Sequence, residues 1–485
     1  MKIESSKITK NNNKINFLLI TILTVFLFIS FYKGVYTNAL ANSFDNNFTN
    51  SFESFQKDSD SIVISSLIYN KQFRNNNGVM TVLQDEGIST SSIFEGYRND
   101  VKFSENNFKE YTSQTGLHTM VYTFFDNVLP FSNSLKLDFY YGINALLSSI
   151  ILAIFVAWIS KKTSWLVGFG LILYISVYDV WIIQFAKSIY WVMWTWFLPM
   201  IISIFLLERY SKTKVYSYTT SFVLICVAII LKCLCGFEYI TTIMISLTVP
   251  YFFYWVTMKW KLIDAIKKLL VVSFGALSGF IISLGIYIIQ YSVHYNSISK
   301  AIKQLSITAF KRIPGNTDVL NDILASGVSA DTIDIYKKSL EVSPMSVVWT
   351  YMTKTFEPIF GPILGPVPYG HFIWFILIVS VLSIGLLCSR ILSKKVKLNI
   401  IGLVIATFVA FIAPISWYAL AKGHSYIHTH INFILWDLPF LLFGISMSIY
   451  VLSIFLVYIT RWDKLSTILF KYNITNDSKR KGGSL

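Results

Sequence analysis

The chain has 485 residues, of which 54% are hydrophobic, 16% aromatic and only 14% charged. Soluble domains average about a quarter charged residues, so this composition, with its long apolar runs, excludes a soluble globular enzyme, a disordered chain and a coiled coil. The sequence therefore predicts a polytopic membrane protein. In a soluble protein the net charge of +15 would suggest nucleic-acid binding, so the position of the charge decides its meaning.

Ten apolar runs are long enough to cross a hydrocarbon core as helices, which takes about 20 residues each. They predict an all-α membrane protein with about ten transmembrane helices. Four aromatic residues at the start of the fourth run, Tyr190, Trp191, Trp194 and Trp196, are expected to form an interfacial belt. The runs lie at 15–33, 139–160, 163–180, 190–207, 215–232, 238–257, 269–291, 372–389, 398–417 and 432–459.

The basic residues predict the orientation. If the N-terminus is cytoplasmic, the inner side carries 23 Lys and Arg against 5 acidic residues, a charge of +18, and the outer side carries −3. The positive-inside rule then places both termini in the cytoplasm and the protein in the cell membrane, with no need for a nucleic-acid partner. The resulting segments are an N-tail (1–14), a first exported loop (34–138), a second exported loop (292–371) and a basic C-tail (460–485), with helices two to seven in 139–291 and the last three in 372–459.

The first run is interpreted as an uncleaved anchor. The alternative is a signal peptide, because Ala39-Leu40-Ala41 resembles a cleavage site. In both cases the segment that follows is exported.

The first exported loop contains two acidic pairs. Asp58 and Asp60 precede apolar residues at helical spacing, which predicts a short amphipathic helix on the membrane with two carboxylates at its start. A carboxylate there can accept a proton or bind a metal, and the alternative is that Asp60 or Ser61 only caps the helix. Asp85, beside Glu86 in an expected turn, is the rival candidate. The apolar residues are Ile62, Ile64, Leu67 and Ile68.

The second exported loop begins with a predicted basic amphipathic helix. Apolar residues from Ile298 to Ala309 share one helix face, and Lys300, Lys303, Lys311 and Arg312 surround it. Such a helix binds anionic headgroups or a lipid-linked phosphate. The alternative is an ordinary interfacial helix with snorkelling lysines.

The last outer loop combines Lys422 with three histidines, His424, His428 and His430. These side chains can hold a phosphate or hydrogen-bond a sugar, and with no acidic partner nearby a zinc site is disfavoured. The other interpretation is that these polar side chains only lie at the membrane interface and bind no ligand. Lys187 and Lys232, at other outer span ends, are the fallback position for a phosphate.

This organisation resembles the GT-C superfamily of integral-membrane glycosyltransferases. The resemblance covers the architecture and one short motif, Asp58-Ser59-Asp60, which is similar to the acidic pair of their first outer loop. It implies a polyprenyl-phosphate-linked sugar as donor and a general base among Asp58, Asp60 and Asp85. It further implies a glycan, lipid or protein acceptor, contact with membrane lipids, and no cofactor, with a divalent metal left open. The resemblance places the donor phosphate near Lys311, Arg312, Lys422, His424, His428 and His430.

Two other functions remain open at this point. A polymerase of undecaprenyl-linked polysaccharide repeats also uses a large outer loop with basic residues. A transporter or lipid flippase should carry ionisable residues buried within the membrane. The apolar runs contain almost none away from their ends, which counts against transport.

Overall fold

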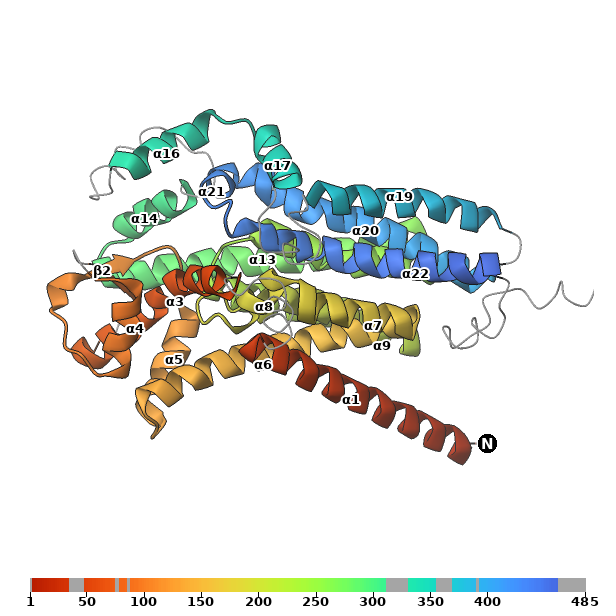
Figure 1. Cartoon of the computed structure of the whole chain (residues 1–485), viewed down its shortest axis with the longest axis horizontal. Coiled ribbons are helices and arrows are strands. Elements are labelled where there is room, and N and C mark those ends of the chain that lie inside the picture. Colours follow the sequence, from red (N-terminus) through yellow and green to blue (C-terminus); the bar gives the residue numbers. More distant parts are fainter. Residues whose placement is uncertain are drawn as a thin grey trace, which may run out of the picture.

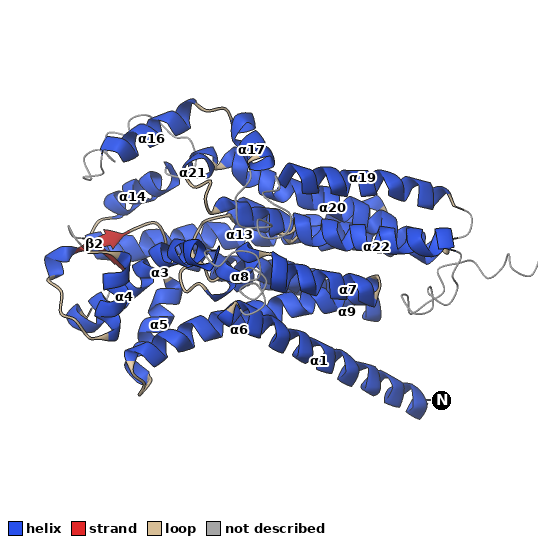
Figure 2. Cartoon of the chain, in the orientation of Figure 1, coloured by secondary structure: helices blue, strands red, loops and turns tan. Residues whose placement is uncertain are grey.

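The computed structural model describes residues 2–34, 48–74, 78–84, 88–310, 330–354, 369–389 and 392–460. Long helices run side by side along the longest axis of the molecule, and shorter helices gather at the end away from the N-terminus (Figure 1). Nearly all regular structure is helical (Figure 2). In the described part of the chain the exception is a two-stranded antiparallel ribbon, which the all-α prediction did not include.

Each of the ten apolar runs contains helix. Among the described residues, seven helices are long and apolar enough to cross a membrane, or eight if the bent pair of α7–η2 and α8 forms one span. The polytopic all-α architecture is therefore supported, whereas the ten-span count is not confirmed. The long helices and their connecting segments are α1 (Lys2–Lys33), α6 (Asn133–Lys162), α7 (Trp165–Leu173), η2 (Tyr174–Tyr178), α8 (Val180–Lys187), α9 (Trp194–Thr213), α10 (Tyr218–Cys235), α11 (Ile240–Ser246), α12 (Val249–Thr257), α13 (Leu262–Tyr295), α19 (Tyr369–Cys388), α20 (Lys394–Leu420), η3 (Asn432–Asp437) and α22 (Phe440–Thr460).

The segment between α1 and α6 forms a compact unit, which we term the N-terminal head (residues 48–128). Its strands pair from Met80↔Tyr111 to Leu83↔Phe108. At 1.5 Å per residue the 34-residue α13 is about 51 Å long, well beyond a 30 Å hydrocarbon core. The head is fastened to the end of this helix, where Tyr287 donates to the Thr112 carbonyl at 2.8 Å. The head contains α3 (Phe48–Phe73), β1 (Met80–Leu83), α4 (Thr90–Arg98), η1 (Glu105–Asn107), β2 (Phe108–Tyr111) and α5 (Leu117–Val128).

Helix α3 corrects the prediction for the first acidic pair. It begins at Phe48 and runs for 26 residues, so Asp58 and Asp60 lie in its middle and neither Asp60 nor Ser61 caps it. The apolar residues that suggested a membrane-lying face are buried within the protein, including Ile64 and Leu67. The helix is therefore a packed core element of the head.

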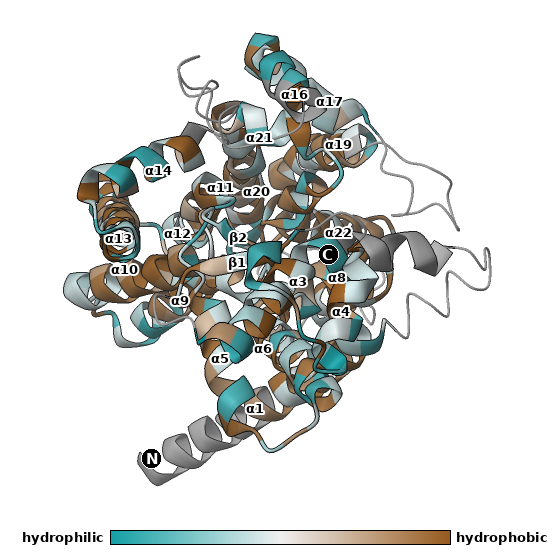
Figure 3. Ribbon diagram, turned by 90° about the vertical axis from the view of Figure 1, so that its left-hand side faces the viewer, coloured by the Kyte–Doolittle hydropathy of each residue, from teal (hydrophilic) through white to brown (hydrophobic). Residues whose placement is uncertain are grey.

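A second group of short helices lies at the same end of the bundle: α14 (Ile298–Phe310), α16 (Ala330–Glu341), α17 (Pro344–Thr353) and α21 (Lys422–Ile427) (Figure 1). The predicted helix at Ile298 is confirmed as α14. Lys311 and Arg312 lie outside the described residues. Seen from this end, hydrophilic segments gather on the head and these short helices, while α10 and α20 are mainly hydrophobic (Figure 3).

The aromatic belt expected at the fourth run is wrong for three of its four members. Tyr190, Trp191 and Trp196 are buried inside the protein, and the Trp191 ring stacks on Tyr239 with centroids 5.6 Å apart. They lie in the turn before α9 or in its first turn, and the backbone N–H of Tyr190 hydrogen-bonds Asp60 of the head. This turn also positions the site described next.

Candidate active site

A polar cavity of about 400 Å³ lies where the head meets the ends of α1, α6 and α8. Its size falls within the range of small-molecule sites, about 300–1,000 Å³. Among the described residues, it combines four basic side chains with three carboxyl groups. The lining residues are Tyr32 and Lys33 from α1, Lys57 and Asp60 from α3, Ser91, Phe94, Glu95 and Arg98 from α4, Asp138 and Tyr141 from α6, and Gln184 and Lys187 from α8.

Asp60 is the buried carboxyl group of this cavity, with 2% of its surface exposed. Its Oδ1 accepts hydrogen bonds from the Ser188 hydroxyl at 2.6 Å and from the backbone N–H of Tyr190 at 3.0 Å. The Tyr141 hydroxyl also hydrogen-bonds the carboxyl group. Because these donors come from α6 and from the turn after α8, the carboxyl group is held in one orientation.

The pKa of Asp60 is raised to about 6, because burial disfavours the charged carboxylate. The hydrogen bonds from Ser188, Tyr190 and Tyr141 and the charge of Lys187 act in the opposite direction. A carboxyl group with this pKa is ionised at neutral pH and binds a proton more strongly than an ordinary aspartate. These are the properties of an effective general base.

The four cations of the cavity, Lys33, Lys57, Arg98 and Lys187, come from four different helices. Sequence reasoning named only Lys187, as a fallback for the phosphate. Lys33 and Arg98 lie 27 and 38 residues from Asp60 in the chain and Lys57 lies three residues before it, and no spacing rule joins them. Their convergence makes the cavity suitable for an anion next to a base.

An apolar groove of about 340 Å³ adjoins the cavity between α1 and α6. Tyr32 and Asp138 line both, so the groove continues directly from the polar site. Its walls are aromatic and aliphatic. The remaining lining residues are Phe28, Phe131, Leu135, Phe139 and Gly142.

Asp58 lies two residues from Asp60 but in different surroundings. Its carboxyl group is exposed and accepts a hydrogen bond from the Thr90 hydroxyl at 2.7 Å, and it does not line the cavity. The structure therefore separates the two members of the motif. Asp85, the rival candidate, lies outside the described residues.

Three histidines form a row of rings that begins at His424 in α21 and continues with His428 and His430 after it. The centroids of His424 and His428 are 4.6 Å apart, and those of His428 and His430 are 5.6 Å apart. Burial lowers the pKa of His430, and the charge of Asp58 partly opposes this effect. The row therefore faces the head near Asp58, and none of its members lines the cavity that contains Asp60.

Lys422 has a structural role in this arrangement. Its ammonium group donates to the carbonyls of Leu340 and Val342, at 2.8 and 2.9 Å, at the end of α16. A lysine that caps the last carbonyls of a helix is engaged in packing. The fallback residue Lys232 is likewise buried and donates to the Gly236 carbonyl. Among the described basic residues that were suggested from the sequence, Lys187 shares the cavity with Asp60.

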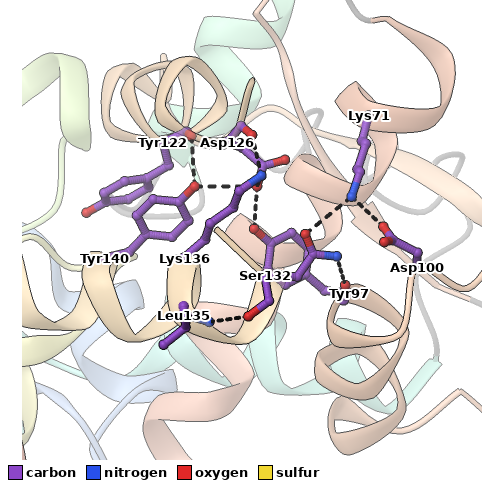
Figure 4. A network of polar contacts seen from close by, with 10 residues as sticks. Lys71, Tyr97, Asp100, Tyr122, Asp126, Ser132, Leu135, Lys136 and Tyr140 are labelled. Atoms are coloured by element: carbon purple, nitrogen blue, oxygen red, sulfur yellow. Dashed lines mark hydrogen bonds and ion pairs between the residues drawn. The ribbon is translucent and has the colours of Figure 1, made fainter. Parts of the chain in front are cut away.

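A buried polar network supports the wall of the cavity formed by α4 and α6 (Figure 4). Lys136 forms an ion pair with Asp126 at 3.4 Å, and Tyr97 donates to the same carboxylate at 2.6 Å. Tyr97 and Tyr140 of this network directly precede Arg98 and Tyr141, which line the cavity. The network thus fixes α4, α5 and α6 relative to one another.

Two of the cations that sequence reasoning missed lie at helix ends. Lys33 ends α1 and Arg98 ends α4, positions at which a cation is ordinary and carries no functional signal. Tyr141 lies within the apolar run 139–160, which indicated only a membrane helix, and Gln184 lies in the short segment between the runs 163–180 and 190–207. Comparison with known proteins finds no matching family model, no similar curated protein and no similar solved structure.

Proposed function

We propose that the protein is a membrane glycosyltransferase that moves a sugar from a polyprenyl-phosphate donor to a cell-envelope acceptor on the outer face of the membrane. The observation that carries the proposal is the buried Asp60, oriented by three hydrogen bonds inside a cavity with four cations. The reaction requires a base for the acceptor and positive charge for the leaving phosphate. Both lie together at this end of the helix bundle.

In the proposed reaction, Asp60 removes the proton from the acceptor hydroxyl as its oxygen attacks the anomeric carbon of the donor. The new oxygen–carbon bond forms while the bond from that carbon to the phosphate oxygen breaks. The lipid phosphate leaves with the electron pair, and the proton remains on Asp60 until it passes to solvent. Lys187 and Arg98 stabilise the negative charge that develops on the phosphate.

The apolar groove between α1 and α6 supports a lipid-linked donor. A phosphate in the cavity would direct an attached hydrocarbon chain past Tyr32 and Asp138 into this groove. Each buried methylene group contributes about 0.8 kcal/mol. A soluble nucleotide-sugar donor would have no use for such a groove.

The donor phosphate provides the first test. We expect Lys187→Met to weaken binding of a polyprenyl phosphate about tenfold or more, because a hydrogen bond to a charged group contributes about 1.5–3 kcal/mol. The matched control is Lys109→Met, an exposed lysine of β2. Affinities are measured by titration of the purified protein in detergent. Unchanged affinity in Lys187→Met together with weaker binding in Arg312→Ala would move the phosphate to the second exported loop.

The groove provides an independent test. A Cβ atom at Gly142 would lie 3.8 Å from the Tyr32 ring, so Gly142→Phe should fill part of the groove. We expect KM for a long-chain donor to rise about tenfold, equivalent to about two buried methylene groups, and KM for a short-chain analogue to stay unchanged. Gly285→Phe on α13 is the control, because no described atom lies within 4 Å of that Cβ position. An equal effect on both donors would exclude a lipid chain from this groove.

A further inference from the structure

A second pair of carboxyl groups lies buried away from the cavity, where a membrane helix is broken. Asp179 separates η2 from α8, and the two segments meet there at 71°. Asp437 ends η3, in a distant part of the chain. Each residue has 1% of its surface exposed. In the sequence both residues lie at the ends of apolar runs, which hides the fact that they meet inside the protein.

In each carboxyl group of this pair, one oxygen atom accepts a hydrogen bond and the other has no donor among the described groups. Oδ1 of Asp179 accepts from the Ile182 backbone N–H at 3.0 Å, and Oδ1 of Asp437 accepts from the Tyr174 hydroxyl at 2.7 Å. The Oδ2 atom of each residue is buried and has no donor among the described groups. The two carboxyl groups lie within hydrogen-bonding reach of each other. Two ionised carboxylates cannot form such a bond, because each is only an acceptor, whereas one added proton would supply the donor.

In the part of the chain that the structure describes, no cation acts on either carboxyl group of the pair. Among the described residues, Asp437 contacts the ionisable groups of Asp179 and Tyr174. Asp179 contacts these two side chains and the backbone N–H groups of Trp181 and Ile182. Two negative charges so close together in a buried site repel each other strongly, and one bound proton removes the repulsion.

We propose that Asp179 and Asp437 form a proton-binding site whose shared proton holds α8 against η3. Helix α8 has eight residues and carries Gln184 and Lys187 into the cavity. Ser188 and Tyr190, which follow it, are the donors that orient Asp60. The pair is thus a positioning device for one wall of the cavity. This last link rests on the proposed function, whereas proton binding does not.

The experiment compares two variants of Asp437: one replaces the shared proton by an amide N–H donor, and the other removes the second carboxyl group. In Asp437→Asn, the amide donates to Asp179 without a titrating proton, so the contact should persist at all pH values. In Asp437→Ala, Asp179 loses its partner and remains buried, which should destabilise the protein. All variants are compared in an Asp60→Asn background, so that the titration of Asp60 does not contribute.

Two measurements on the purified full-length protein decide the proposal without an activity assay. Infrared spectroscopy at neutral pH should show the carbonyl stretch of a protonated carboxylic acid, and Asp437→Asn should abolish it. The unfolding equilibrium constant of the parent should rise about tenfold per pH unit while the folded state holds one proton more than the unfolded state. Stability falls with rising pH because the unfolded chain has already released this proton. The Asp437→Asn variant should lack this dependence.

Three results would overturn the proposal. The first is an infrared spectrum of the parent that lacks a protonated carboxyl band, or that has such a band which persists in Asp437→Asn. The second is the same pH dependence of stability in the parent and in Asp437→Asn. The third is a stability or spectrum that changes with sodium or calcium concentration, which would assign the pair to a metal cation. Loss of donor binding in Asp437→Ala but not in Asp437→Asn would support the link to the cavity, and equal loss in both would refute that link alone.

Discussion

Replacing Asp60 by Asn should reduce sugar transfer by about two to four orders of magnitude, while the amount of folded protein stays normal. An amide keeps the size of the side chain and its hydrogen bonds with Ser188 and Tyr141, but it cannot accept the acceptor's proton. Transfer is measured with purified protein, a polyprenyl-phosphate sugar and extracted acceptor. The large expected effect follows from the burial of Asp60 inside the cavity.

The matched control is Asp58→Asn, the same change two residues earlier on the same helix. Asp58 is exposed and bonded to Thr90, so we expect its replacement to leave the transfer rate nearly unchanged. Full activity in Asp60→Asn would refute the proposed base. If Asp85→Asn alone were inactive, the base would be Asp85.

The pH dependence of the same reaction gives a second readout on Asp60. A general base works only when it is ionised, so kcat/KM should be constant at high pH and fall about tenfold per unit below the Asp60 pKa of about 6. Lys187 lowers this pKa. The Lys187→Met variant should therefore shift the fall in rate to higher pH. A profile that is flat through pH 6 would contradict the assignment of Asp60.

The second large effect concerns stability. We expect Lys136→Met to lower the free energy of unfolding by about 3–5 kcal/mol, because it leaves the buried Asp126 carboxylate without its cation. The measurement is thermal or denaturant unfolding of the protein in detergent, with all variants in the same detergent. Loss of this ion pair should also loosen α4 and α6 around the cavity.

Lys71→Met is the control within the same network. Lys71 forms an ion pair with Asp100, but the two side chains are 38% and 62% exposed. Exposed ion pairs contribute about 0–1 kcal/mol, so this change should have little effect. Equal destabilisation by the two variants would show that burial does not determine the strength of the network.

Several features of the protein follow from sequence alone. Apolar runs of about 20 residues predict membrane helices because a buried backbone must satisfy its hydrogen bonds within the segment. The structure contains helix in every one of these runs, and the amphipathic pattern from Ile298 predicts α14 correctly. Local rules suffice here because hydropathy and helical periodicity act over a few turns. The ribbon of β1 and β2 escaped these rules because its four-residue strands are too short to give a pattern.

Only the tertiary structure decides between Asp58 and Asp60. Two residues apart on a helix, their side chains differ by about 200° in direction, so one faces the protein when the other faces solvent. The sequence predicted a short helix starting at this pair, and without the other elements of the head it gave no reason to bury one member. Asp60 is the candidate base because it is the buried member and because the Ser188 hydroxyl, 128 residues away in the chain, hydrogen-bonds it.

The same reason explains why the cavity and the carboxyl pair were not predictable. Lys187, Arg98 and Asp138 lie on separate helices, and Asp437 meets the η2–α8 break through Tyr174, 263 residues earlier in the chain. Local sequence determines which segments become helices, because that choice depends on neighbouring residues. The packing of those helices determines which polar side chains share a cavity and lose contact with water, and this sets their pKa values and hydrogen bonds.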